Sequence, residues 1–277
     1  VPTVVADPDL TTIVDYDCDG LATISVATSN TTDFDYTYSL NSTLNTPSDN
    51  NIFTNVADGT HTITVGYSSS ITPSQSTLLF EDFGEGTTTQ IEEIGPGYCY
   101  EPQDGTETDC NLGPAGILAN GEYTVTNFVT NPVTYFLSPN DHTGLTDGRF
   151  LAIDVSTLAG DYGVLWERDN IEVLPNQDIT LSFWAYNFMN TTGSGNNPEV
   201  LVELVDGSGT VLSSIATNEI PKNTNADDWY FREVTFNPGA NTTVSIVLRT
   251  NLNSDSGNDL IVDEIQAVQS PEVCEKT

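Results

Sequence analysis

The amino-acid sequence predicts an all-β protein in which a small sandwich is followed by a larger antiparallel β domain. Three observations support this fold class. The 277-residue chain is rich in Thr, Asn, Asp, Gly, Val and Ile. Its apolar runs have the length of strands and are separated by turn residues. No stretch keeps the apolar period of an α-helix over a typical helix length.

The chain carries a large negative charge. Six Lys and Arg stand against forty Asp and Glu, which gives a formal net charge of -34. Nucleic acids and anionic membrane surfaces both require basic footprints, so the charge excludes nucleic acid as a partner. No secretory signal is present and no apolar run is long enough to cross a bilayer, so we expect no membrane insertion of this segment.

The first expected domain spans residues 1–70 and is a small sandwich. Three of its stretches alternate apolar and polar residues, which is the period of a strand with one buried face. These stretches are residues 22–26, 34–40 and 61–67. The polar segment that follows contains Pro73, which cannot join a central ladder. We expect this segment to be a linker and the second domain to cover residues 71–277.

Three segments of the first domain, taken in order, carry a resemblance. They are Tyr36–Leu40, Asn51–Val56 and Asp58–Val65. This order is similar to the SprB-type repeat, which occurs in tandem in giant surface adhesins of gliding bacteria. The resemblance implies an immunoglobulin-like spacer in an extracellular, cell-surface adhesin, with neighbouring modules of the same long chain as partners. Such repeats often close with a cysteine that is absent here, so Cys18 lacks its expected local partner.

The second domain is expected to contain about nine strands joined by long irregular connections. We expect them at residues 78–83, 122–128, 149–154, 179–188, 199–205, 210–216, 229–236, 242–250 and 260–268. This number of strands fits a jelly roll, in which two antiparallel sheets share a core and the first and last strands end up close together.

An acid in the last expected strand suggests a bound cation. Asp263 falls between Ile261 and Ile265, and side chains two apart on a strand share a face. A carboxylate on a buried apolar face has to be neutralised, paired or bound to a metal. Because the chain offers few basic partners, a hard cation held by oxygen ligands is one interpretation. The alternative is that Asp263 lies at a sheet rim, solvated or bonded to backbone amides.

Five segments of the second domain carry a second resemblance. They are Leu79–Gly84, Asp141–Thr143, Asp147–Asp154, Leu181–Asn187 and Gly257–Asp263. Their order and spacing are similar to those of the carbohydrate-binding, galactose-binding-like jelly rolls of secreted bacterial proteins. The resemblance implies a glycan ligand and a structural calcium ion (Ca2+) held between acids of the first and last strands. The matching positions are Glu81 or Asp82, and Asp263, with Asp147 and the carbonyl groups near Gly148 as further ligands.

Aromatic residues of the stretch 179–188 are candidates for contact with a glycan. Trp184 and Tyr186 share one face of the expected strand. On an outer face, flat rings can stack on the C–H faces of sugars. Trp166 and Arg168 are further candidates, and Tyr135 is a weaker one. The alternative for these aromatic side chains is packing in the core.

The sequence offers little for catalysis. Its two histidines, His61 and His142, fall in different expected domains, so a triad built on histidine is not expected. No Gly-rich phosphate cradle follows a strand and opens a helix. Paired carboxylates for glycoside hydrolysis depend on a separation in space that the sequence does not give. We therefore expect no enzymatic activity.

The four cysteines are compatible with an oxidising compartment. Cys99 and Cys110 flank a loop rich in Gly, Pro and acidic residues and could form a local disulfide. Cys18 and Cys274 are remote in sequence and could pair only if the fold permits.

The leading functional hypothesis is adhesion or surface recognition without catalysis. In this interpretation the first domain is a spacer, and the second is a calcium-stabilised jelly roll that binds a glycan or another cell-surface ligand. Two alternatives remain open. Both domains could be structural spacers, or the second could be an accessory binding domain of a polysaccharide-degrading enzyme.

Overall fold

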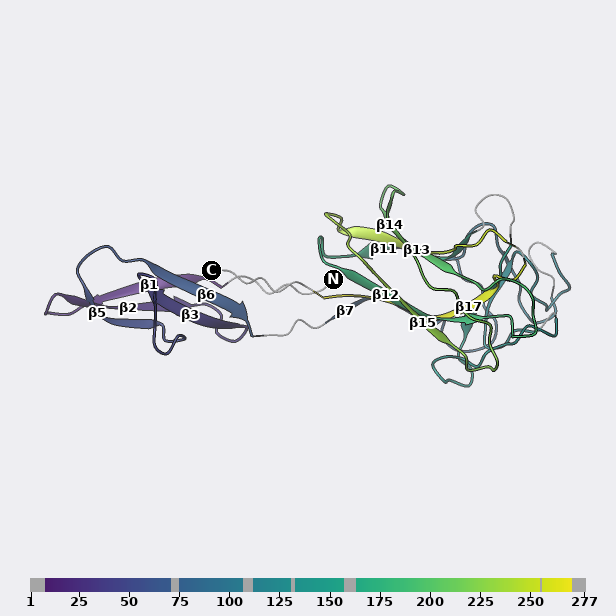
Figure 1. Cartoon of the computed structure of the whole chain (residues 1–277), viewed down its shortest axis with the longest axis horizontal. Coiled ribbons are helices and arrows are strands. Elements are labelled where there is room, and N and C mark those ends of the chain that lie inside the picture. Colours follow the sequence, from purple (N-terminus) through teal and green to yellow (C-terminus); the bar gives the residue numbers. More distant parts are fainter. Residues whose placement is uncertain are drawn as a thin grey trace. The chain divides into compact units, whose positions relative to one another are not determined.

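The computed structural model describes residues 8–70, 75–106, 112–130, 133–156, 163–254 and 256–270. Within these ranges every regular element is a β-strand, so the predicted all-β class is confirmed (Figure 1). The chain divides into two compact units, a smaller one within Pro2–Gln75 and a larger one spanning Ser76–Gln269. The described part of the chain contains no helix that could span a membrane.

The smaller unit is a sandwich of two three-stranded sheets. One sheet has the strand order β1-β2-β5, and the other has the order β4-β3-β6. The strands are β1 (Leu10–Tyr16), β2 (Leu21–Thr28), β3 (Phe34–Leu40), β4 (Thr43–Leu44), β5 (Ile52–Ala57) and β6 (Ile63–Ser69). A small apolar core forms from Ile24, Val26, Tyr38, Phe53 and Val56.

Alternation identified three strands of this unit. The predicted strand at 34–40 coincides with β3, the stretch 22–26 lies inside β2, and the stretch 61–67 overlaps β6. Strand β1 was not predicted, because each of its seven residues is exposed. A strand without a buried face carries no apolar alternation.

The larger unit is a jelly-roll sandwich of a seven-stranded and a four-stranded sheet. The first sheet has the order β15-β12-β17-β10-β9-β8, with β7 also paired to β17, and the second has the order β11-β16-β13-β14. Strand β7 at the start of the unit pairs with the last strand, β17, as expected. The strands are β7 (Ser76–Glu81), β8 (Cys99–Tyr100), β9 (Glu122–Thr126), β10 (Phe150–Asp154), β11 (Val164–Glu172), β12 (Ile179–Asn187), β13 (Val200–Asp206), β14 (Val211–Ala216), β15 (Tyr230–Phe236), β16 (Thr243–Thr250) and β17 (Leu260–Gln269).

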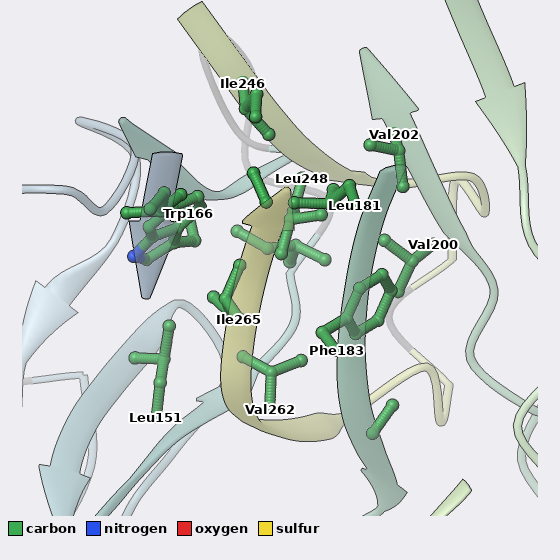
Figure 2. Close-up of a cluster of buried hydrophobic side chains, with 14 of the residues drawn as sticks. Leu151, Trp166, Leu181, Phe183, Val200, Val202, Ile246, Leu248, Val262 and Ile265 are labelled. Carbon is green, nitrogen blue, oxygen red and sulfur yellow. The ribbon is translucent and has the colours of Figure 1, made fainter. Parts of the chain in front are cut away.

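One apolar core fills the space between the two sheets. Figure 2 shows Trp166 of β11 with Leu181 and Phe183 of β12 in this core. All three side chains are fully buried. Burying one such side chain contributes about 1.5–3 kcal/mol relative to leaving it exposed. The core is therefore the main source of stability of this unit.

A second apolar cluster lies on the outer face of the seven-stranded sheet, the face turned away from the four-stranded sheet. Strand residues of this face, such as Phe150 and Tyr186, pack there against residues of the connecting loops. We call this cluster the covered half of the outer face. Its buried members are Leu118, Val129, Phe136, Phe150, Ala152, Tyr186, Phe188, Met189 and Ile261.

The alternation of side chains between the two faces of the sheet is interrupted within strand β17. Ile261 belongs to the outer cluster, whereas Ile265 belongs to the core between the sheets. The cause is a bulge, seen as a register shift opposite β12, at which Glu264 has a φ of 46°. The expectation that Asp263 shares a face with both isoleucines is therefore wrong for Ile265.

Candidate functional site

The rest of the outer face is built from β15, β12, β17 and β7. Trp184 on β12 lies opposite Phe231 on β15. Gln266 on β17 lies opposite Phe80 on β7. We call this region the open half. It consists of Phe80, Ser182, Trp184, Phe231, Glu233 and Gln266, whose positions in the ladders alternate with those of core residues.

Aromatic rings mark both sides of the open half. Phe80 is 51% exposed and Phe231 is 47% exposed. Trp184 is half-buried, with its ring centroid 5.2 Å from that of Phe231 and 3.9 Å from that of His142. His142 stacks on Trp184 and covers one face of its ring. Phe231 and Phe80 therefore supply most of the exposed ring surface.

The loop that carries His142 is fixed to the sheet. The His142 amide donates a hydrogen bond to Asp263 Oδ2 at 3.3 Å, and His142 Nδ1 contacts the Glu264 carboxylate. Trp229 Nε1 donates to the Asn140 carbonyl oxygen at 3.0 Å. This loop forms the boundary between the covered half and the open half.

Polar side chains lie between the two phenylalanines. Ser182 is opposite Glu233 on one side and Gln266 on the other. A hydroxyl, a carboxylate and an amide together offer both donors and acceptors of hydrogen bonds. Exposed rings with a few polar groups between them have the composition of a ligand-binding surface.

The structure separates the four residues predicted to contact a ligand. Trp184 lies on the open half. Tyr186 and Trp166 are fully buried, in the outer cluster and in the core respectively, so the prediction that they contact a ligand is wrong. Arg168 lies on β11 of the other sheet, where its guanidinium bonds Glu81 at 2.7 Å. Tyr186 and Trp166 therefore follow the alternative of packing in the protein interior.

The acids predicted to hold calcium have protein partners of their own. Glu81 is paired with Arg168, as described above, and Asp82 Oδ1 accepts a hydrogen bond from the Gly84 amide at 3.0 Å. Asp147 is exposed. Within the described ranges, no group of three or more His, Cys, Asp or Glu side chains is arranged to hold a metal ion. Calcium stays a prediction from the sequence.

Asp263 is fully buried and is held by backbone amides. Its Oδ1 accepts a hydrogen bond from the Glu264 amide at 2.7 Å, and its Oδ2 accepts one from His142. Burial raises the pKa of Asp263 to about 8, and the nearby Asp141 charge acts in the same direction. Asp141 Oδ1 is itself buried without a hydrogen-bond partner in the structure. The carboxylate of Asp141 is close enough to Asp263 to raise its pKa, and the two groups could share a cation.

Acids on the covered side of the outer face were missed by the sequence reasoning. Asp154 ends β10 and is 5% exposed, and Asp259 precedes β17 and is 4% exposed. Burial, followed by the charge of Asp259, raises the pKa of Asp154 far above its usual range. The signal was present, because Asp154 follows Phe150 and Ala152 at a spacing of two, as Asp263 follows Ile261.

The exposed rings of the open half were also missed. On β15, Val234 and Phe236 face the core, so the alternation of a strand places Phe231 and Glu233 on the other face. On β7, buried Leu79 precedes exposed Phe80. In both strands the neighbouring core residues were the signal that could have identified these positions.

Cys99 is disulfide-bonded. Its predicted partner, Cys110, and the remote Cys274 lie outside the described residues. Cys18 is a free, exposed cysteine.

Comparison with known proteins identifies no family for this chain. No protein-family model and no curated protein matches the sequence. Among solved structures, the CBM22-1 xylan-binding domain of Paenibacillus barcinonensis Xyn10C is 14% identical, over 73% of this chain and 99% of that chain, with a TM-score of 0.39. The Stig cyclase Fisc from Fischerella sp. TAU is 18% identical, over 72% and 99% of the two chains, with a TM-score of 0.41. The C-terminal CBM6 of LamC from Zobellia galactanivorans is 14% identical, over 44% and 80%, with a TM-score of 0.28. Likeness at this level decides neither the fold nor the function of this chain.

Proposed function

We propose that the larger unit binds glycan, without catalysis, through the open half of its outer face. The observation that carries the proposal is the pair of exposed rings, Phe80 and Phe231, on either side of a polar row on one sheet face. Strands β15 and β7 are separated by β12 and β17. At about 4.8 Å per strand, the two rings stand about 14 Å apart across the sheet, which suits a chain of sugars better than a single ring.

The chemistry of a sugar chain matches this surface. Sugar rings present C–H faces, which stack on Phe231 and Phe80, and hydroxyl groups, which bond Ser182, Glu233 and Gln266. The protein's net charge of -34 opposes acidic polysaccharides, so the proposed ligand is a neutral glycan.

The sequence resemblances extend the proposal beyond this surface. They support an extracellular, cell-surface adhesin in which the smaller unit is a spacer and neighbouring modules are partners. They also support calcium as a stabilising ion, and the geometry favours Asp263 and Asp141 over Glu81 and Asp82 as its carboxylate ligands. The competing function is a spacer role for both units, in which the exposed rings bind nothing.

A glycan array followed by calorimetry tests the proposal. The full chain is screened against neutral polysaccharides in calcium buffer, and the affinity for any ligand found is measured for wild type and for Phe231→Ala. We expect a loss of affinity of about tenfold, which corresponds to about 1.4 kcal/mol. Phe128→Ala is the matched control, because Phe128 is 59% exposed and is not part of the open half.

Two results would contradict the proposal. No binding on the array favours the spacer function. Equal losses of affinity in Phe231→Ala and Phe128→Ala would show that the ligand does not depend on the open half.

A further inference from the structure

A cavity of about 600 Å³ lies in the larger unit, at the end where β9 and β17 begin and β10 and β12 end. Its walls come from the loops around Leu118, Tyr135 and Gly193, and its lining includes Asp154 and Asp259. None of the six residues of the open half lines it. Pockets that bind small molecules have volumes of about 300–1,000 Å³. The volume of this cavity falls within that range, and its lining shares no residue with the open half. The cavity is therefore a candidate for a second ligand site.

The lining contains a buried pair of carboxyl groups. Asp259 Oδ1 accepts a hydrogen bond from the Val155 amide at 3.0 Å. Burial raises the pKa of both carboxyl groups, and the charge of Asp259 raises the pKa of Asp154 further. Asp154 Oδ1 is buried and has no hydrogen-bond partner in the structure. Because buried polar atoms are normally hydrogen-bonded, we expect a molecule bound in the cavity to donate a hydrogen bond to this oxygen.

The walls of the cavity are held by contacts that need no ligand. Glu101 Oε1 accepts a hydrogen bond from the Gly116 amide at 2.7 Å, which fixes the loop that leads to Leu118. Lys222 Nζ donates to the Gly193 carbonyl oxygen at 2.7 Å and fixes the opposite loop. A pocket with fixed walls loses little conformational entropy when a ligand binds.

Close packing of two backbones completes the wall. Gly257 has a φ of 76°, and a Cβ there would lie 2.5 Å from the Asn196 backbone nitrogen. Only glycine permits this approach, which joins the loop after β12 to the loop before β17.

An aromatic ring lies at the rim of the cavity. Tyr135 is 38% exposed and meets Phe136 edge-on at a centroid distance of 5.3 Å. Met189 adds a buried apolar surface to the lining. The site thus combines an apolar wall with a buried acceptor, Asp154 Oδ1, in a strongly acidic protein that disfavours anions.

We propose that this cavity binds a neutral saccharide of one or two rings, with a ring face on Tyr135 and a hydroxyl group donating to Asp154 Oδ1. A metal ion fits less well, since no group of three or more acidic, His or Cys side chains in the described ranges is arranged to hold one. The site is distinct from the open half and does not depend on the function proposed for that surface.

Ligand-observed saturation-transfer NMR on the full chain tests the inference. The probes are methyl glycosides of glucose, galactose, mannose and xylose, and their β-1,4-linked dimers. We expect at least one probe to bind wild type and Tyr135→Ala to lower its affinity about tenfold or more. Tyr135→Phe keeps the ring and should stay within about threefold of wild type, which separates loss of stacking from loss of folding. Asp154→Asn keeps a carbonyl acceptor and donates its amide to Asp259, so it should also bind.

Each other outcome overturns the inference. Binding of no probe would show that the cavity takes no small saccharide. Equal affinity in wild type and Tyr135→Ala, with loss in Phe231→Ala, would place the saccharide on the open half instead. If calcium alone raises the thermal midpoint of wild type but not of Asp154→Asn, the carboxyl pair is a cation site.

Discussion

The two halves of the outer face belong to the same sheet but meet different surroundings. Phe150 on β10 is fully buried, whereas Phe231 on β15 is 47% exposed. Acids differ in the same way, since Asp154 on the covered side is 5% exposed and Glu233 on the open half is exposed. Strand alternation places all four side chains on the outer face. What differs is the loops, which pack over one half and leave the other half accessible.

This difference shows that two factors determine the role of a side chain on one sheet. The period of a strand decides which face a side chain occupies. Loops decide whether that face becomes a second core or a surface for a ligand. The same aromatic residue type therefore stabilises the fold in the covered half and is available for binding in the open half.

The largest expected effect compares one phenylalanine from each half. Phe150→Ala removes a fully buried ring and should lower the free energy of unfolding by about 3–5 kcal/mol. Phe231→Ala removes an exposed ring and should cost less than about 1 kcal/mol. Urea denaturation of the two variants measures both values. Similar losses of stability in the two variants would show that the open half is also a packed core. That result would contradict the difference between the covered half and the open half.

The next effect concerns the buried acids of the covered side. Burial and the Asp259 charge, with a smaller contribution from Glu122, raise the pKa of Asp154 in the folded state above its unfolded value. The folded state then binds more protons than the unfolded state, so stability should fall as pH rises above about 4. One proton changes stability by up to about 1.4 kcal/mol per pH unit, or about 2.7 kcal/mol from pH 6 to 8.

Asp154→Asn isolates this contribution. Asparagine can donate its amide to Asp259 and cannot ionise, so the variant should lose less stability than wild type between pH 6 and 8. Denaturant midpoints at both pH values, with Glu233→Gln as the exposed control, measure the difference. Parallel curves for wild type and Asp154→Asn would contradict the assignment.

Much of the fold could be predicted from the sequence, because most strands have one buried and one less buried face. The expected strand at 122–128 begins with β9, and the expected strand at 179–188 differs from β12 by one residue. Strand β11 was not predicted. Its charged residues Glu167, Arg168 and Asp169 interrupt the apolar run, and a register shift breaks its alternation.

The candidate site was less predictable, because it depends on what covers a face. Alternation correctly put Trp184 and Tyr186 on one face of β12, but only the loops distinguish half-buried Trp184 from fully buried Tyr186. The bulge at Glu264 likewise depends on pairing with β12 rather than on the residues of β17 alone. Sequence patterns identify faces, and tertiary contacts assign them a role.

A smaller effect tests the predicted calcium ion at the boundary between the halves. At a tenfold excess over its dissociation constant, a bound ion would raise stability by about 1.4 kcal/mol. Thermal unfolding with calcium and with a chelator should differ in wild type, and Asp263→Asn should remove the difference. Glu233→Gln is the control, because Glu233 is an exposed acid that is not among the predicted calcium ligands. An unchanged wild-type midpoint would leave Asp263 as an acid held only by the Glu264 and His142 amides.

The smallest expected effect concerns the loop that separates the halves. Trp229→Phe removes the hydrogen bond to the Asn140 carbonyl oxygen but keeps an aromatic ring near Tyr186 and His142. The loss of one such bond should lower the free energy of unfolding by about 1 kcal/mol. Since Trp229 is not part of the open half, glycan affinity should stay within about twofold of wild type. Denaturation and calorimetry measure the two quantities, and a loss of affinity as large as that of Phe231→Ala would show that the position of this loop, and not only the exposed rings, determines binding.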